Sequence, residues 1–194
     1  MDKKEILKQF LGQFPALSQQ EIEDISDHLL IEQFSKGSIL QEEGHIPEQC
    51  YFVIQGCVRQ YQIQEGVDRT IEFFTEKNGA VTSHSYLQQI PSDHYLGCEE
   101  NSILLIGNPI QDQKMFEKFP ILESITRMMM EQEWGKTKEA MASYIGASPE
   151  QRYINFLNKR ADLLQRVPQY QIASYLGMTP ESLSRIRKRL ASKS

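Results

Sequence analysis

The chain has 194 residues, 40% of them apolar, which is enough for one large packed domain or two small ones. No apolar run approaches the about 20 residues of a membrane-spanning helix, and the N-terminus lacks the apolar run and cleavage site of a secretion signal. Cys50, Cys57 and Cys98 are scattered and odd in number, which fits a reducing compartment better than a disulfide framework. We therefore expect a cytoplasmic protein with free thiols and no membrane contact.

Charge is divided unevenly along the chain, whose net charge is −5. Residues 151–194 hold nine Lys and Arg against two Asp and Glu, a net charge of +7. Residues 1–150 hold twelve Lys and Arg against 24 Asp and Glu, a net charge of −12. A basic end on an acidic body favours phosphate binding confined to the C-terminal part.

Residues 2–34 have the apolar spacing of helices. Within them, Ser18 followed by Glu21 has the pattern of a capping box at the start of a second helix. We therefore expect helices over this whole segment.

From residue 34 to about residue 108 the sequence changes to short β-rich runs separated by turn signals that contain glycine. The close spacing of these runs predicts an antiparallel sandwich or barrel. The expected strands are Ser38–Gln41, Cys50–Ile54, Val58–Ile63, Thr70–Phe74, Tyr95–Cys98 and Ser102–Ile106.

The spacing then predicts a short helix over Gln111–Lys118 and a long helix over Ile121–Ile145, with Gly146 just past its end. Apolar residues cover more than one face of the long helix. Such a helix must be covered from two sides, for example by its own sheet and by another subunit; the alternative is a core helix. Residues 146–149 form the natural hinge, with Ser148 as the N-cap of the next helix.

The segment Val167–Leu190, VPQYQIASYLGMTPESLSRIRKRL, is the most informative part of the sequence. It reads as two short helices joined at Gly177, where only glycine takes a positive φ without penalty. Thr179 can cap the second helix, and Pro180 suits its first position. This is the pattern of a helix-turn-helix, whose second helix lies in the DNA major groove.

The second helix of this pair has an apolar stripe of Leu183, Ile186 and Leu190. Its outward face is polar and basic. Such a face either contacts DNA or belongs to a solvated surface helix. The outward residues are Glu181, Ser182, Ser184, Arg185, Lys188 and Arg189.

Enzyme chemistry finds little support in the sequence. The histidines form no His-x-His pair of the kind that a metal-dependent β-barrel enzyme commonly needs, and no phosphate-binding loop or dinucleotide fingerprint is present. Three dispersed cysteines cannot supply the four thiolates of an iron–sulfur cluster. We therefore expect a protein that is not an enzyme and has no metal site.

Three segments resemble the Crp/Fnr family of bacterial transcription regulators: Phe34–Gly44, Tyr51–Tyr61 and above all Ile172–Lys188. The resemblance covers nearly the whole chain. It implies an α+β fold with an antiparallel, jelly-roll-like β-roll of eight strands, a long dimerisation helix and a C-terminal helix-turn-helix. The implied domains are a cyclic-nucleotide-binding-like roll over residues 1–120, the dimerisation helix over 121–146 and the DNA-binding domain over 147–194.

The resemblance also implies a homodimer that senses a signal through its roll and binds a palindromic operator. Glu181 and Arg185 match the positions that reach base edges, with Ser182 as their neighbour; Thr179, Arg187, Lys188 and Arg189 are better assigned to phosphates. The implied partners are double-stranded DNA, a second copy of the chain, RNA polymerase and a small-molecule effector. The alternative is a ligand- or partner-binding module without specific DNA binding.

The sequence departs from the family at the nucleotide pocket. Members that bind cyclic nucleotide carry a Gly-Glu pair for the ribose and an arginine for the phosphate. The corresponding segment, Asn78–Cys98, has neither, and a buried phosphate without a cation is costly. We therefore expect no cyclic nucleotide in the usual mode, and no other cofactor is indicated. Candidate ligand-pocket residues are Ser83, His84, Ser85 and Ser92, for which surface polarity is the alternative reading.

Overall fold

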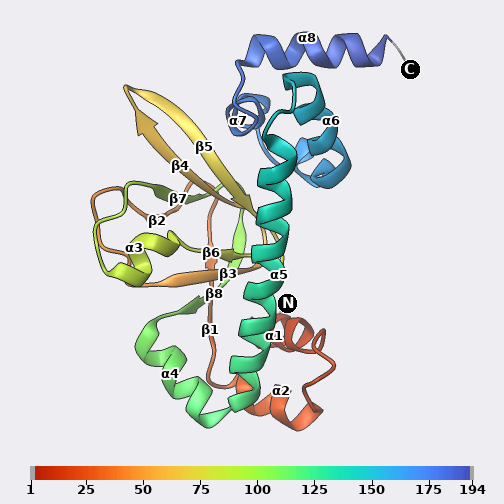
Figure 1. Ribbon diagram of the computed structural model, residues 1–194. Coiled ribbons are helices and arrows are strands. Elements are labelled where there is room, and N and C mark those ends of the chain that lie inside the picture. Colours follow the sequence, from red (N-terminus) through yellow and green to blue (C-terminus); the bar gives the residue numbers. More distant parts are fainter. Residues whose placement is uncertain (1–2, 193–194) are drawn as a thin grey trace.

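The computed structural model describes residues 3–192 and combines two antiparallel sheets with helices at both ends (Figure 1). The strands are β1 Leu30–Phe34, β2 Ile39–Gln41, β3 Cys50–Gln55, β4 Val58–Gln64, β5 Val67–Phe74, β6 Gly79–Ala80, β7 Tyr95–Cys98 and β8 Ser102–Gly107. The helices are α1 Lys3–Leu11, α2 Gln19–Ser26, α3 Ser83–Gln88, α4 Pro109–Lys118, α5 Pro120–Tyr144, α6 Pro149–Lys159, the 3-10 helix η1 Ala161–Gln165, α7 Gln169–Tyr175 and α8 Pro180–Ala191.

The two sheets form a β-roll, as the sequence predicts. One has the strand order β1-β8-β3-β6 and the other β2-β7-β4-β5. In β3 and β8 the inward residues alternate with outward ones, so Tyr51 pairs with Ile106 and Val53 with Leu104 on the buried face. Val58 of β4 and Leu96 of β7 join the same apolar cluster from the other sheet. All six strands predicted from the sequence are present.

The expectation of helices throughout residues 2–34 is wrong at its end. The capping box at Ser18 is formed: its side chain accepts from the Glu21 N–H, and the Glu21 carboxylate accepts from the Ser18 N–H. Residues 30–34, however, form β1 and pair with β8, Ile31 opposite Leu105. A short apolar run such as this has no decisive periodicity, so the exposed edge of β8 determined its conformation.

Two other helices differ from the expectation. The helix predicted over residues 111–118 begins two residues earlier, because the Asn108 side chain accepts the Gln111 N–H at 2.9 Å and Pro109 takes the first position. α3, over residues 83–88, was not predicted at all. Thr82 at its start makes no side-chain capping bond, so the usual sequence signal of a helix start is missing there.

α5 runs along the molecule from α1, α2 and α4 at one end to α6, α7 and α8 at the other (Figure 1). Leu122 and Ile125, near its start, are buried in the apolar cluster that α1 and α2 form. Beyond them the helix is largely exposed, with Met130, Trp134 and Met141 about two-thirds accessible. The first part of α5 is therefore covered by its own chain, and the second part leaves apolar side chains in solvent.

The cysteines are free thiols, as expected. Cys57 and Cys98 are buried, and burial raises the pKa of Cys57 to about 12 and that of Cys98 to about 11. Both thiols are therefore protonated at neutral pH and poor nucleophiles. Among the helices of residues 3–192, none combines the length and apolarity needed to cross a membrane.

The turn between β3 and β4 requires glycine at position 56. Gly56 has φ +113°, and a Cβ built there would lie 2.3 Å from Ser102 Oγ and 2.7 Å from Ser102 Cα. Both the backbone conformation and the space therefore exclude a side chain.

We expect Gly56→Ala to lower the free energy of unfolding by about 2 kcal/mol or more, because the new Cβ combines backbone strain with a clash. Thermal unfolding followed by circular dichroism measures this. Gly135→Ala, inside α5 with no atom within 4 Å of the new Cβ, is the matched control and should stabilise by about 0.8 kcal/mol. Equal effects of the two substitutions would contradict this account of the turn.

Candidate nucleic-acid interface

α7 and α8 meet at a tight apolar elbow, as the sequence predicts. Ile172, Ala173, Leu183 and Ile186 are buried between them. Gly177 has φ +63°, and a Cβ there would lie 2.5 Å from the Tyr144 hydroxyl oxygen. The elbow therefore holds α8 at a fixed angle to α7.

Thr179 starts α8 as its N-cap. Its Oγ1 accepts the Ser182 N–H at 3.3 Å, and Pro180 follows as the first helical residue. This bond satisfies one of the four N–H groups that lack a partner at a helix start. The predicted cap is confirmed.

The outward face of α8 carries Glu181, Ser184, Arg185 and Lys188, all exposed. These residues are spaced three and four apart and so lie on one side of the helix, opposite Leu183 and the rest of the buried stripe. Ser184, which was not assigned a role with the base-edge residues, shares this face. Ser184 follows Glu181 by three residues, and this helical spacing could have predicted from the sequence that the two share a face.

Three of the predicted residues lie on the flanks of α8 instead. Ser182 is half-buried, and its hydroxyl lies 3.2 Å from Thr179 Oγ1. Arg187 is also half-buried and lines a cavity of about 200 Å³ on the side of η1 and α7. Arg189 lies toward α6, where its Nη2 donates to Glu150 Oε2 at 2.6 Å.

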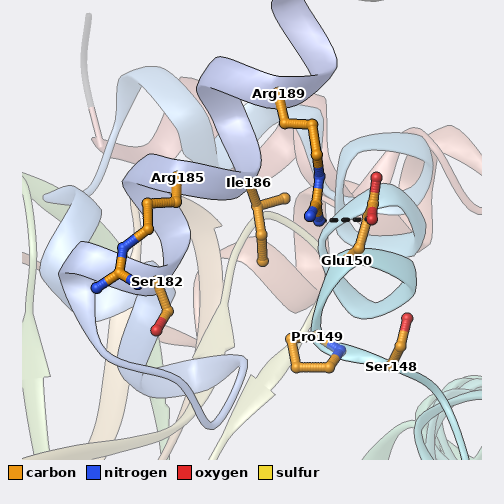
Figure 2. A pocket seen from close by; sticks show the side chains of 7 residues that line it. All are labelled: Ser148, Pro149, Glu150, Ser182, Arg185, Ile186 and Arg189. Atoms are coloured by element: carbon orange, nitrogen blue, oxygen red, sulfur yellow. Dashed lines mark hydrogen bonds and ion pairs between the residues drawn. The ribbon is translucent and has the colours of Figure 1, made fainter.

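An open pocket of about 330 Å³ lies between α8 and the start of α6. Figure 2 shows Arg185 and Ser182 on one side of it, and the Arg189–Glu150 ion pair with Ser148 and Pro149 on the other. Two arginines and the N-terminal end of α6 give it a positive lining, which Glu150 partly neutralises. The site is therefore suited to an anion once Arg189 is released.

Glu181 is ionised at neutral pH. Its own backbone N–H and the Thr179 hydroxyl hydrogen bond to its carboxylate and lower its pKa, and the charge of Arg185 acts in the same direction. A carboxylate and a guanidinium one helical turn apart thus present an acceptor and a fork of donors to the same side. The guanidinium can donate to acceptor groups on base edges, and the carboxylate can accept from donor groups on base edges.

The four candidate ligand residues of the roll do not share one environment. Ser83 and His84 are exposed on α3, whereas Ser85 and Ser92 are buried. The Ser92 hydroxyl donates to the His94 carbonyl at 2.9 Å and accepts the His94 N–H at 3.1 Å, so it stabilises its own turn. Their ligand role stays a prediction. Residues 3–192 contain no group of three or more His, Cys, Asp or Glu residues placed to hold a metal ion.

Comparison with solved structures confirms the fold. FixK2 from Bradyrhizobium japonicum superposes with a TM-score of 0.68 at 16% identity, over 85% of each chain. A CooA mutant from Carboxydothermus hydrogenoformans gives 0.68 at 16% identity over 94% of this chain and 83% of its own. The c-di-GMP-responsive global regulator CLP of Xanthomonas campestris gives 0.67 at 15% identity over 91% and 93%.

These matches span the roll, the long helix and the helix-turn-helix, so the chain has the Crp/Fnr fold. No protein-family model matches the chain, and comparison with curated proteins found no match. At this level of identity the likeness concerns the fold, and function must be argued from the site.

Proposed function

We propose that this protein is a DNA-binding transcription regulator that acts in the cytoplasm and is not an enzyme. The observation that carries the proposal is the outward face of α8, where Arg185 and Lys188 are exposed on a helix whose other side is fixed in a buried elbow. Arg185 would donate to guanine O6 and N7, and Glu181 would accept from cytosine N4. Thr179, Lys188 and Arg189, on or beside this face, would contact phosphates.

We propose that the regulator is a homodimer built on α5. Met130, Trp134, Thr137, Met141 and Tyr144 follow one another at intervals of four, three, four and three residues. This is the a/d spacing of a coiled coil, and all five side chains are exposed in the single chain. A symmetric pair of α5 helices would cover this seam and place two α8 helices about 34 Å apart, which suits a palindromic operator.

The roll would receive the signal, and RNA polymerase would be a partner of the DNA-bound dimer. Cyclic nucleotide in the usual mode does not fit. The arginines of residues 1–120 are Arg59 and Arg69. Arg59 is buried and bound to Asp68 and Glu99, and Arg69 is exposed on β5, so neither is a free cation for a phosphate inside the roll. We therefore propose a different small-molecule effector, or none.

Selection of bound sequences from random duplexes tests the proposal directly. An enriched palindrome supports it, and the absence of any enrichment would favour a ligand- or partner-binding module.

On the selected operator, Arg185→Ala should raise the Kd about 5- to 150-fold and relax the preference at one base pair, because a bidentate base contact is worth about 1–3 kcal/mol. Lys188→Ala is the matched control on the same face. It should weaken binding about equally on all sequences and reduce the salt dependence. Fluorescence anisotropy on operator and random duplexes measures both. If the Arg185→Ala variant distinguished the two duplexes as well as the native protein does, the proposed contact of Arg185 with a base edge would be refuted.

Glu150→Gln should strengthen DNA binding. The substitution frees Arg189 for a phosphate, so the slope of log K against log salt should steepen by about 0.9 for each α8. Binding titrations between about 50 and 200 mM salt measure this slope. Glu43→Gln, in the loop between β2 and β3, makes the same change in net charge away from α8 and should leave the slope unchanged. An equal change of slope in both variants would mean that the net charge of the protein, and not the release of Arg189, alters DNA binding.

Trp134→Glu should weaken dimerisation by at least about 30-fold, since a buried aromatic at the centre of an interface is worth about 2 kcal/mol or more. Sedimentation velocity over a concentration series measures the dissociation constant. Glu139→Gln, on the opposite side of α5, serves as the control. A native protein that sediments as a monomer at all concentrations would contradict the dimer.

A further inference from the structure

Arg166, between η1 and α7, joins the helix-turn-helix to three turns of the roll. Its Nη2 donates to the Gly56 carbonyl at 2.8 Å, in the turn between β3 and β4. Nη1 and Nη2 donate to the two carboxylate oxygens of Glu76, both at 2.9 Å, in the turn between β5 and β6. Nε and Nη2 donate to Glu100 Oε1 at 3.0 and 2.5 Å, in the turn between β7 and β8. We call these four residues the Arg166 clamp.

On the side of the roll, a further hydrogen bond joins two members of the clamp. The Gly56 N–H donates to Glu76 Oε1 at 2.9 Å, so this carboxylate is held by the turn as well as by Arg166. Partial burial alone would raise the pKa of Glu76, but these hydrogen bonds outweigh it and lower the pKa. Glu76 is therefore ionised at neutral pH, and its bidentate pairing with a guanidinium fixes direction as well as distance.

Further contacts join the same two parts of the chain. Gln171 Nε2 of α7 lies 2.9 and 3.0 Å from the two carboxylate oxygens of Glu99, which also accepts from Arg59 Nε at 2.6 Å. The Thr70 N–H, on the edge of β5, donates to the Ser174 hydroxyl at 2.9 Å. These contacts lie beside the clamp and follow the line along which α7 packs on β5.

The chain segment that joins α5 to α6, around Gly146, is exposed. Ile145 and Gly146 are exposed, Gly146 has φ +79°, and no atom lies within 4 Å of a Cβ built there. Tyr144 and Arg152 stack across this connector at 4.0 Å on the surface of the molecule. Tyr144 also lies against the elbow at Gly177, so the orientation of α8 relative to α5 depends on this local contact together with the more numerous charged contacts with the roll.

We propose that Arg166 is a positioning residue: it binds the helix-turn-helix to its own roll, and so presents α8 at one fixed angle to α5. Figure 1 shows α8 on the far side of α6 and α7 from the sheets, so this arrangement leaves the face of α8 open. The DNA-binding consequence rests on the proposed function. The fixed angle between α8 and α5 does not depend on the proposed function.

The angle is tested without DNA. Lys136 of α5 and Ser184 of α8, both exposed, are changed to cysteine and spin-labelled, with Cys50 changed to Ala and with excess unlabelled chains so that intrachain distances dominate. The native protein should give one narrow distance distribution. Arg166→Ala should lose it and give a broad one, and Arg166→Lys, which keeps the charge without the fork of donors, should restore it in part. Arg69→Ala removes an exposed arginine of β5 and should change nothing.

A folded Arg166→Ala variant with the native narrow distribution would overturn the proposal. If that variant does not fold, Glu100→Ala decides by the same measurement, because it removes the acceptor of two clamp bonds and leaves Arg166 in place: a broad distribution supports the proposal and the native narrow one overturns it.

Operators whose half-site spacing is changed by one or two base pairs give the second readout. A fixed α8 tolerates one spacing, so the native protein should discriminate strongly. Arg166→Ala should reduce the ratio of Kd values for altered and native spacing by about tenfold, an effect that simple loss of stability would not give. Failure of the native protein to bind any DNA would refute the proposed function and leave the distance result valid. Unchanged spacing discrimination in folded Arg166→Ala would refute the positioning role.

Discussion

The helix-turn-helix completes its apolar core with side chains from the roll. Phe73 of β5 and Cys57 of the turn before β4 belong to the same buried cluster as Phe156, Leu163 and Ile172. Residues 147–192 alone would form a very small domain, and a chain of that size buries too little apolar surface to be very stable. Packing against the roll therefore both stabilises the three-helix unit and determines where it lies.

This contact changes the meaning of the charge distribution. The C-terminal part has a surplus of basic residues, but Arg160 and Arg166 bind carboxylates of the roll, and Arg189 binds Glu150. Some of the acidic surplus of the roll is the counterpart of these arginines at the shared boundary. The charge available to DNA is accordingly smaller than the net charge of the segment, and it is concentrated on the outward face of α8.

Local sequence signals predicted the helices and turns well where one residue type has a specific conformational role, such as a helix cap or a glycine with positive φ. The glycine at the elbow of α7 and α8, the cap at Thr179 and the capping box at Ser18 all have the conformation that the sequence implies. β1 and α3 were missed because a short apolar run and an uncapped helix start carry no such signal. The contact of Arg166 with Gly56 spans 110 residues of sequence, and no local pattern distinguishes it from a solvated arginine.

The same limit applies to the site. Helical spacing places Arg185 and Lys188 on one outward face, and the structure agrees. It cannot tell that Arg187 lies in a cavity beside η1, or that Arg189 has a carboxylate partner on α6, because both facts depend on how neighbouring helices pack. Sequence periodicity gives the face of a helix, whereas its flanks are determined by tertiary structure.

α5 and the roll thus act on α8 through different physical means. The start of α5 is anchored in the apolar cluster with α1 and α2, and the helix then extends beyond it as one continuous rod. At the far end the chain passes through an exposed glycine, and Tyr144, the last residue of α5, contacts Arg152 and the elbow at Gly177. The roll adds a second set of contacts that fix the orientation of α8, through the turns that carry Gly56, Glu76 and Glu100. A shift of those turns relative to α5 would rotate α8 without any change in the elbow that supports it.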